Sequence, residues 1–388
     1  MISTLSKNII DFVAANWVYR LFGIAMWMLS GGFIVFLYIA YGWQKSALAI
    51  TGLAIGVVFF RCQFGFSYTW RVLFTRGDGT GLRAQMLWIA LAALPFAWLS
   101  GNIGGGDVYA VMNVRPLTTG IAVGALLFGV GMQLGGACTS GSIVGAGQGG
   151  TVPFISIAGF IAGAIVAAEQ AEFWQELPAA TSFSFYGEWG IWGALAIIAM
   201  GIVVILASLT LPLPSNSSAP PPKRMSLYVG AIILALLSII LLALAKQPWG
   251  IINGLSILGA KTLFILGYED IEFWDYWSRF ATGSDALHSG WFEGTQLVTT
   301  VSMLLGVVVA AVAAGKFSLS FGGGKRLLLS LSGGVIMGYG AQISYGCNIG
   351  SYISALSSGS AHGWLWLFFA FVGTAIGVGA RRLVGLDK

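Results

Sequence analysis

Charged residues are scarce in this sequence of 388 residues. They make up 9% of the chain, against roughly 25% in soluble domains, whereas hydrophobic residues make up 57% and the mean hydropathy is +0.85. A soluble globular protein is therefore excluded, because one core could not hide so many apolar side chains. Apolar runs long enough to cross a bilayer indicate a polytopic membrane protein instead.

Cysteine is scarce too, and the motifs of several enzyme classes are absent. The three cysteines, Cys62, Cys138 and Cys347, have no pairwise spacing, so neither a disulfide framework nor a CxxC metal site is predicted. The sequence contains no Walker motif, metal-ligand cluster or Ser/His/Asp set, so we expect no cofactor and no use of ATP. Lys and Arg on the cytoplasmic side account for the net charge of +5, and the fifteen Trp suit the membrane interfaces, so no nucleic-acid partner is implied. The partner is the lipid bilayer.

The apolar runs predict an all-α protein with about nine to eleven membrane spans, the first of them retained at the N-terminus. They lie roughly at 21–41, 47–60, 84–100, 118–134, 151–168, 189–212, 227–245, 249–266, 296–314, 329–343 and 363–380. Two short runs, 118–134 and 329–343, lead directly into Gly-rich polar stretches that contain a cysteine. This pattern predicts broken or re-entrant helices.

An internal repeat divides the chain in two. Residues 131–142 (GMQLGGACTSGS) and 340–351 (GAQISYGCNIGS) share five identities without a gap at a constant offset of 209. The Pro- and Ser-rich stretch 213–224 separates the two copies. We therefore expect a first repeat at 1–188, a joining helix and linker at 189–226, and a second repeat at 227–388.

Charge predicts the orientation of these repeats. Ten of the fourteen acidic residues lie in two loops, 169–188 and 269–293, which we place outside the cell. Basic residues gather near 71–83, in the linker, at 316–326 and at the C-terminus, which we place in the cytoplasm. This arrangement makes 84–100 and 296–314 cross in opposite directions, as in the inverted repeats of transporters.

Cys138 and Cys347 occupy equivalent places in the two copies, where a pseudo-twofold axis would bring them together. Glycines let backbone N–H groups face an anion there, and helices that begin near Ser140 and Ile349 would direct positive dipole ends at it. The alternative is that both cysteines are small buried hydrophobes beside glycines that only permit close packing; their duplication favours the pathway. The candidate pathway residues around the two cysteines are Gln133, Gly135, Gly136, Thr139, Ser140 and Ser142 in the first copy, and Gln342, Gly346, Asn348 and Ser351 in the second.

Three further residues are candidates for the pathway. Arg61 and Cys62 end an apolar run, and a cation beside a thiol lowers its pKa and attracts anions; an ordinary interfacial helix end is the alternative. Lys261 lies within an apolar run, where an ionisable residue is a functional candidate by default. Its alternative is a lysine that reaches the membrane surface.

These motifs, together with PWGIINGLSILGAK and FGFSYTWR, resemble those of the YeeE/YedE family of bacterial membrane proteins. The resemblance implies uptake of thiosulfate across the inner membrane through a waist lined by cysteines, with S–H groups holding the ion and a small TusA-like sulfur carrier protein receiving it. It matches Cys138 and Cys347 to the two central cysteines of the family. The third family cysteine falls at Gly65, and Cys62, expected on the same helical face, is the candidate for a displaced thiol.

Three classes of function compete at this stage. The first is a transporter of thiosulfate or a similar sulfur anion, and sulfite, sulfide or selenium analogues also fit these residues. The second is a membrane sulfurtransferase that forms a cysteine persulfide, and the third is a scaffold subunit. The duplicated cysteine motif favours the transporter, since a catalyst needs no such symmetry, so we expect a protein that is not an enzyme.

Overall fold

A computed structural model describes residues 2–101, 110–209, 224–279 and 285–386, and this part of the chain is almost entirely helical. Nine helices or helix runs in it are long and apolar enough to cross a membrane, or ten if a bent pair counts as one span. An all-α polytopic membrane protein with nine to eleven spans is thereby confirmed. The long helices are α1 (Ile2–Tyr41), α2 (Trp43–Cys62), α4 (Thr80–Leu99), α5 (Thr119–Leu134), α7 (Thr151–Glu169), α10 (Ile191–Leu209), α11 (Arg224–Ala245), α12 (Ile252–Ile265), α15 (Thr295–Ala313), α16 (Gly324–Ile343) and α18 (His362–Leu383).

Short elements connect or extend these helices. The only strands in the described residues, β1 (Leu117–Thr118) and β2 (Ala179–Ala180), form one antiparallel pair. The short helices are α3 (Phe66–Arg76), α6 (Thr139–Gly147), α8 (Ala171–Glu176), α9 (Phe185–Trp189), the 3₁₀ helix η1 (Glu269–Phe273), α13 (Asp275–Arg279), α14 (Asp285–His288), the π-helix η2 (Asn348–Ser354) and α17 (Ala355–Ser357). The predicted linker at 213–224 lies almost wholly outside the described residues.

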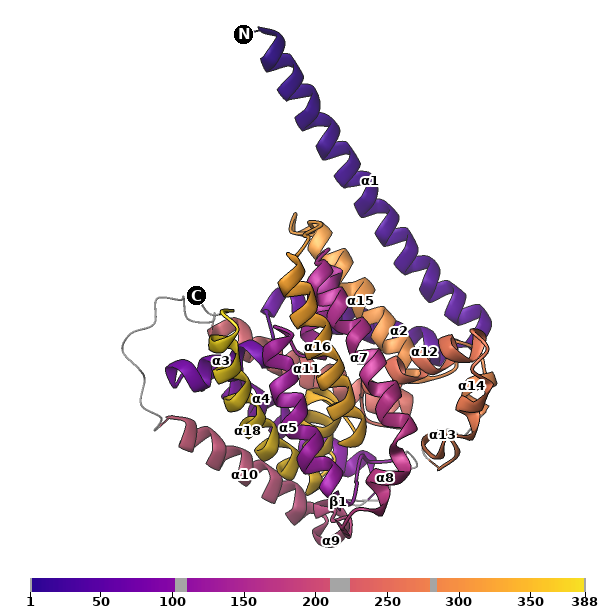
Figure 1. Ribbon diagram of the computed structural model, residues 1–388, viewed down its shortest axis with the longest axis vertical. Helices are drawn as coiled ribbons and strands as arrows, with labels where there is room; N and C mark the ends of the chain where they lie inside the picture. Colours follow the sequence, from indigo (N-terminus) through magenta and orange to yellow (C-terminus); the bar gives the residue numbers. More distant parts are fainter. Residues whose placement is uncertain (1, 102–109, 210–223, 280–284, 387–388) are drawn as a thin grey trace.

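Four helices form the centre of the bundle, with α16 against α7 and α5, and α18 against α5 (Figure 1). Glycine makes this close approach possible, because a Cβ at Gly338 would collide with the backbone carbonyl of Phe160, and one at Gly373 with that of Leu126. Small residues at helix contacts are the usual means by which membrane helices pack. The four helices place the two cysteine motifs in the middle of the protein.

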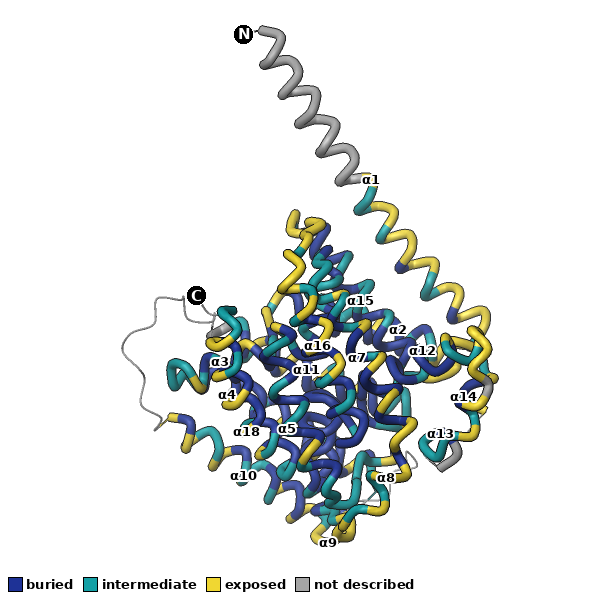
Figure 2. Tube along the Cα trace, viewed as in Figure 1, coloured by how far each residue is buried: buried dark blue, intermediate teal, exposed yellow. Residues whose placement is uncertain are grey.

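The outer helices surround this centre. Helix α15 packs against α2, and α4 packs against α10 and α11. Residues 21–41 of α1 contact α2 and α15 but leave most of their surface exposed, whereas buried residues concentrate in the middle of the bundle (Figure 2). An apolar helix that exposes so much of its surface is suited to contact with lipid.

Candidate functional site

Cys138 lies at a break between two helices. Helix α5 ends at Leu134, and Cys138 is the N-cap residue of α6. Its sulfur accepts a hydrogen bond from the Gly141 backbone N–H at 3.4 Å and lies 3.3 Å from the Ser140 hydroxyl. The thiol is 1% exposed, so it sits at the positive end of a helix inside the protein.

Cys347 lies at the corresponding break in the second half. Helix α16 ends at Ile343, and Cys347 precedes η2, which continues into α17 after a bend of 41° from α16. The Ser351 hydroxyl donates to the Ser344 carbonyl at 2.7 Å and thereby closes the turn on itself. Cys347 is also 1% exposed, and it belongs to the same buried cluster of residues as Cys138. We call residues 135–142 and 344–351 the two cysteine turns.

Several polar atoms of the cysteine turns are buried and have no hydrogen-bond partner within the described part of the chain. They are the hydroxyls of Thr139 and Ser142 and both amide atoms of Asn348. All three side chains are at most 1% exposed. An unsatisfied buried polar group costs about 1–3 kcal/mol, so their retention beside both thiols favours a site that receives a polar ligand.

The two predicted glutamines hold the helix ends before the cysteine turns. The side-chain amide of Gln133 donates to the Ser67 carbonyl at 3.1 Å, and the backbone carbonyl of Gln133 accepts from the Arg381 guanidinium at 2.6 Å. Gln342 accepts from the Ser256 hydroxyl at 2.8 Å, while its Nε2 lies beside Tyr276 without good hydrogen-bond geometry. Both glutamines therefore help to position the ends of α5 and α16.

The predicted glycines differ in their surroundings. A Cβ at Gly346 would lie 2.6 Å from the Ser351 backbone nitrogen, so a side chain there would displace the start of η2. Gly135 packs against α16, where a Cβ at Gly333 would lie 2.3 Å from the Gly135 backbone nitrogen. Gly136 has φ +86° and open space around it. A side chain at Gly136 would strain the backbone without filling a contact, contrary to the expectation that it closes an approach to the backbone donors.

The helical argument for Cys62 is wrong. Helix α2 ends at Cys62, because Gln63 adopts a left-handed conformation with φ 52°, and Gly65 is the extended N-cap residue of α3. Cys62 and Gly65 therefore do not share a helical face. The Cys62 side chain packs against α11 at Gly230, and Arg61 is exposed. Cys62 therefore does not replace the thiol expected at position 65 by sharing a helical face with it.

Lys261 is buried in α12 and tied to a loop. Its ammonium group donates to the backbone carbonyls of Ser289 and Gly290 at 2.7 and 3.1 Å, and it lies 5.7 Å from the Trp291 ring. It is 4% exposed. These bonds use the donors of the ammonium group, so Lys261 is better placed to hold the loop than to bind a passing anion.

Sequence reasoning missed a cavity of about 650 Å³ that leads toward the second cysteine turn. We call it the mouth cavity. Its rim includes the exposed residues Val111, Asp285 and Glu293, and its inner end includes the buried residues Gln342 and Gly350, the latter three positions beyond Cys347. The lining also contains Lys261 and Arg115. The only signal in the sequence was a basic residue in a loop just before an apolar run, which says nothing of a cavity.

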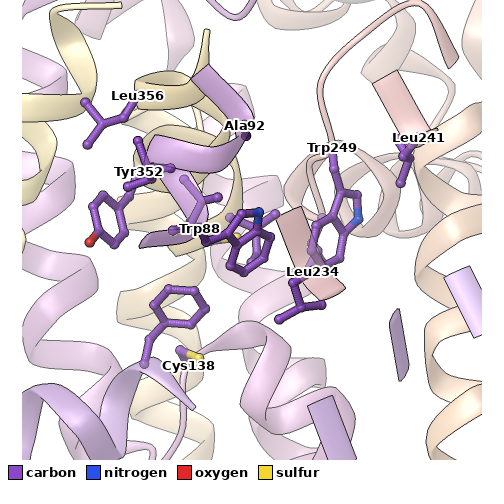
Figure 3. Packing of buried hydrophobic residues seen from close by; sticks show 14 of the residues in the cluster. Trp88, Ala92, Cys138, Leu234, Leu241, Trp249, Tyr352 and Leu356 are labelled. Carbon is purple, nitrogen blue, oxygen red and sulfur yellow. The ribbon is translucent and has the colours of Figure 1, made fainter. Parts of the chain in front are cut away.

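Aromatic residues form the walls beside the cysteine turns. Figure 3 shows Cys138 in one buried cluster with Trp88 and Tyr352, with Trp249 further along. Tyr352 stacks on Trp366 and donates to the Gln85 side chain at 3.3 Å. Outside the membrane helices, burial raises the pKa of Tyr276 at the cavity, so its phenol stays neutral at physiological pH. The walls exclude water from the cysteine turns without adding charge.

This combination of apolar helices, broken in the middle of the bundle around buried polar groups, defines a multi-pass membrane protein with an internal polar site. The chain belongs to the sulphur transport family, whose model matches residues 61–376. The thiosulfate transporter TsuA of Spirochaeta thermophila is 25% identical over 342 residues, which cover 84% of this chain and 95% of that protein. TsuA of Escherichia coli K12 is 25% identical over 275 residues, covering 66% of this chain and 72% of the relative. A probable transporter, YedE of Salmonella typhimurium, is 29% identical over 141 residues, covering 34% of this chain and 31% of the relative.

Proposed function

We propose that this protein carries thiosulfate, or a closely similar sulfur-containing anion, across the bacterial inner membrane along a path between the two cysteine turns. The observation that carries the proposal is the set of unpartnered buried polar atoms at Thr139, Ser142 and Asn348. They belong to the same turns as two thiols that are each almost inaccessible from outside. An anion in passage would accept hydrogen bonds from these hydroxyls, the amide and the S–H groups of Cys138 and Cys347.

Backbone groups supply most of the compensation for the charge. An unpaired charge in the bilayer costs at least several kcal/mol, and Lys261 is engaged with loop carbonyls. The N-terminus of α6 and that of η2, which continues into α17, direct the positive ends of their helix dipoles toward the cysteine turns. A path of this kind admits anions and rejects cations.

The same geometry speaks against a sulfurtransferase that forms its persulfide on Cys138 or Cys347. A persulfide on a cysteine is useful only if a soluble acceptor can reach the sulfur. Cys138 and Cys347 are each 1% exposed, so a protein acceptor cannot approach them. A brief S–H hydrogen bond to a passing ion needs no such access.

We also propose that residues 1–188 and 227–388 are inverted repeats joined by 189–226. Reciprocal contacts support this proposal. Gly129 packs against the carbonyl of Ala370, and Gly338 packs against that of Phe160. The two glycines differ by 209 positions and their partners by 210. A glycine of the first half thus contacts a carbonyl of the second half, and the equivalent glycine of the second half contacts the nearly equivalent carbonyl of the first. A pseudo-twofold axis through the centre would produce such pairs.

The same proposal also gives the protein an orientation in the membrane and a partner protein. The mouth cavity is bordered by the acidic loop that includes Asp285 and Glu293, so we place it on the outer side of the membrane. The linker and the C-terminus, which carries Arg381 and Arg382, then lie in the cytoplasm, where a TusA-like sulfur carrier would accept the product. Labelling of single cysteines introduced at Asp285 and Lys325 with an impermeant reagent on whole cells tests this orientation, since only the first should react.

The decisive experiment measures uptake of radiolabelled thiosulfate into proteoliposomes. We expect Cys138→Ala and Cys347→Ala each to slow uptake by about tenfold or more, because each removes a hydrogen bond to a charged ligand. Cys62→Ala is the same chemical change at a partly exposed site, and its effect should be smaller. Uptake at the wild-type rate in both central variants, with normal folded yield, would show that the path lies elsewhere.

A further inference from the structure

The mouth cavity contains a cation whose function the transport path does not explain. Arg115 precedes β1 and is partly exposed in this cavity. Its Nε donates to the Asn113 side-chain carbonyl at 3.2 Å, and its guanidinium carbon lies 5.6 Å from the centre of the Tyr345 ring. Arg115 makes no ion pair with any residue of the described segments. A guanidinium carries five N–H donors, so most of them remain available to a ligand.

Asn113 links this arginine to the second cysteine turn. Its side-chain amide donates to the Gly350 carbonyl at 2.9 Å, and its backbone N–H donates to the Ser358 hydroxyl at 3.2 Å. The guanidinium is therefore oriented by a side chain that is itself bound to η2, three residues after Cys347. An anion bound to Arg115 would lie at the inner approach to that turn.

The other charges of the cavity leave Arg115 as the group with free donors. Lys261 is engaged with the carbonyls of Ser289 and Gly290. Glu293 is exposed at the rim and accepts a hydrogen bond from the Gly290 backbone at 3.2 Å, and Asp285 is also exposed. Solvent screens these rim carboxylates from the inner end.

Buried N–H groups add donors near the cavity. Trp249 and Trp277 both line it, each is 2% exposed, and neither indole N–H has a partner in the described part of the chain. A lining of donors with a cation suits an oxyanion, because a guanidinium fork can pair with two oxygen atoms of one ligand. A cationic solute would be repelled by the guanidinium, and a neutral one would gain the hydrogen bonds without the attraction between charges.

We propose that Arg115 forms a capture site in the mouth cavity for the same class of sulfur oxyanion that the cysteine turns pass, a site separate from the turns and placed before them. This proposal rests on the proposed function. Such a site raises the local concentration of the anion at the entrance of the path. The capture site lowers the KM for the anion, while the cysteine turns set the maximal rate of transport.

Transport kinetics in proteoliposomes test the capture site. We expect Arg115→Gln to raise the KM for thiosulfate by about tenfold or more, since hydrogen bonds to charged groups contribute that much to binding, with the maximal rate nearly unchanged. Arg326→Gln is the matched control: it removes the same charge from an exposed position that does not line the cavity. Asn113→Ala should raise the KM as well, because Arg115 loses its orienting partner. An unchanged KM in Arg115→Gln, with active wild-type vesicles, overturns the capture site alone; inactive wild-type vesicles overturn the proposed function instead.

A binding measurement separates capture from passage. In the Cys347→Ala background, thiosulfate should still raise the thermal stability of the purified protein, because bound ligand stabilises the folded state. Adding Arg115→Gln should abolish that rise, and adding Arg115→Lys should restore part of it, since lysine keeps the charge without the fork. A rise of equal size with and without Arg115 would place the bound anion elsewhere and refute the proposal.

Discussion

Thr139 and Asn348, which begin the helices after the two cysteines, allow a sharp test of the buried polar site. Both side chains are 1% exposed, and the Thr139 hydroxyl and the Asn348 amide have no partner in the described part of the chain. Thr139→Val keeps the shape and removes one unsatisfied hydroxyl, which costs about 1–3 kcal/mol when buried. We expect the variant to be more stable and less active.

Both the gain in stability and the loss of uptake should be measurable. A gain of about 1 kcal/mol raises the Tm by roughly 1 °C in a protein of 388 residues, and Asn348→Leu should match or exceed this value because it removes two unsatisfied atoms. Uptake should fall by about tenfold for each lost hydrogen bond to the anion. Thermal unfolding in detergent and uptake into proteoliposomes are the two measurements.

Ser302 provides the matched control. Its hydroxyl is also buried and unpartnered in the described part of the chain, but Ser302 is not part of either cysteine turn and lies on α15 against Gly52 of α2. Ser302→Ala should leave uptake unchanged. If Thr139→Val kept full uptake, or lost stability, the hydroxyl would not be reserved for a ligand and the reasoning would be refuted.

Two further predictions concern glycines and the buried lysine. Gly346→Val should stop uptake because its side chain displaces the start of η2, whereas Lys261→Met should lower the Tm by freeing the loop carbonyls and should slow uptake less. Uptake and thermal unfolding are measured for both variants. An inactive Lys261→Met beside an active Gly346→Val would mean that a fixed cation sets selectivity. Gly129→Val and Gly338→Val should reduce the folded yield about equally, since both place a side chain against a carbonyl of the partner helix; size-exclusion profiles that differ strongly between them would contradict the pseudo-twofold arrangement.

The helices could be predicted because their cause is local. A run of about twenty apolar residues must form its backbone hydrogen bonds within itself in a bilayer. Each of the eleven expected runs contains a helix of the described residues, although 210–212 of the run 189–212 lie outside them, and α5 and α16 end at the expected positions 134 and 343. The failure at Cys62 was local as well: a single left-handed residue, Gln63, ended α2 where three-residue spacing suggested continuity.

The mouth cavity could not be predicted because its cause is not local. Arg115 approaches the second cysteine turn only because Asn113 bonds to Gly350, which lies 237 residues away in the chain. The role of Lys261 likewise depends on a loop 28 residues further on. A hydropathy pattern contains no record of such pairings, since each partner is an ordinary loop or helix residue until the chain has packed.

Close packing and an unsatisfied centre depend on each other in this protein. The polar atoms at Thr139, Ser142 and Asn348 make the fold less stable, and the two cysteine turns would relax toward one another or toward lipid if the helices around them could move. Backbone contacts at glycines such as Gly338 prevent this, because carbonyl and glycine meet with no side chain between them to yield. In the proposed function, the glycine contacts therefore keep the polar atoms apart and unpaired until an anion binds, so that a stable bundle can hold a site whose polar groups are satisfied only when it is occupied.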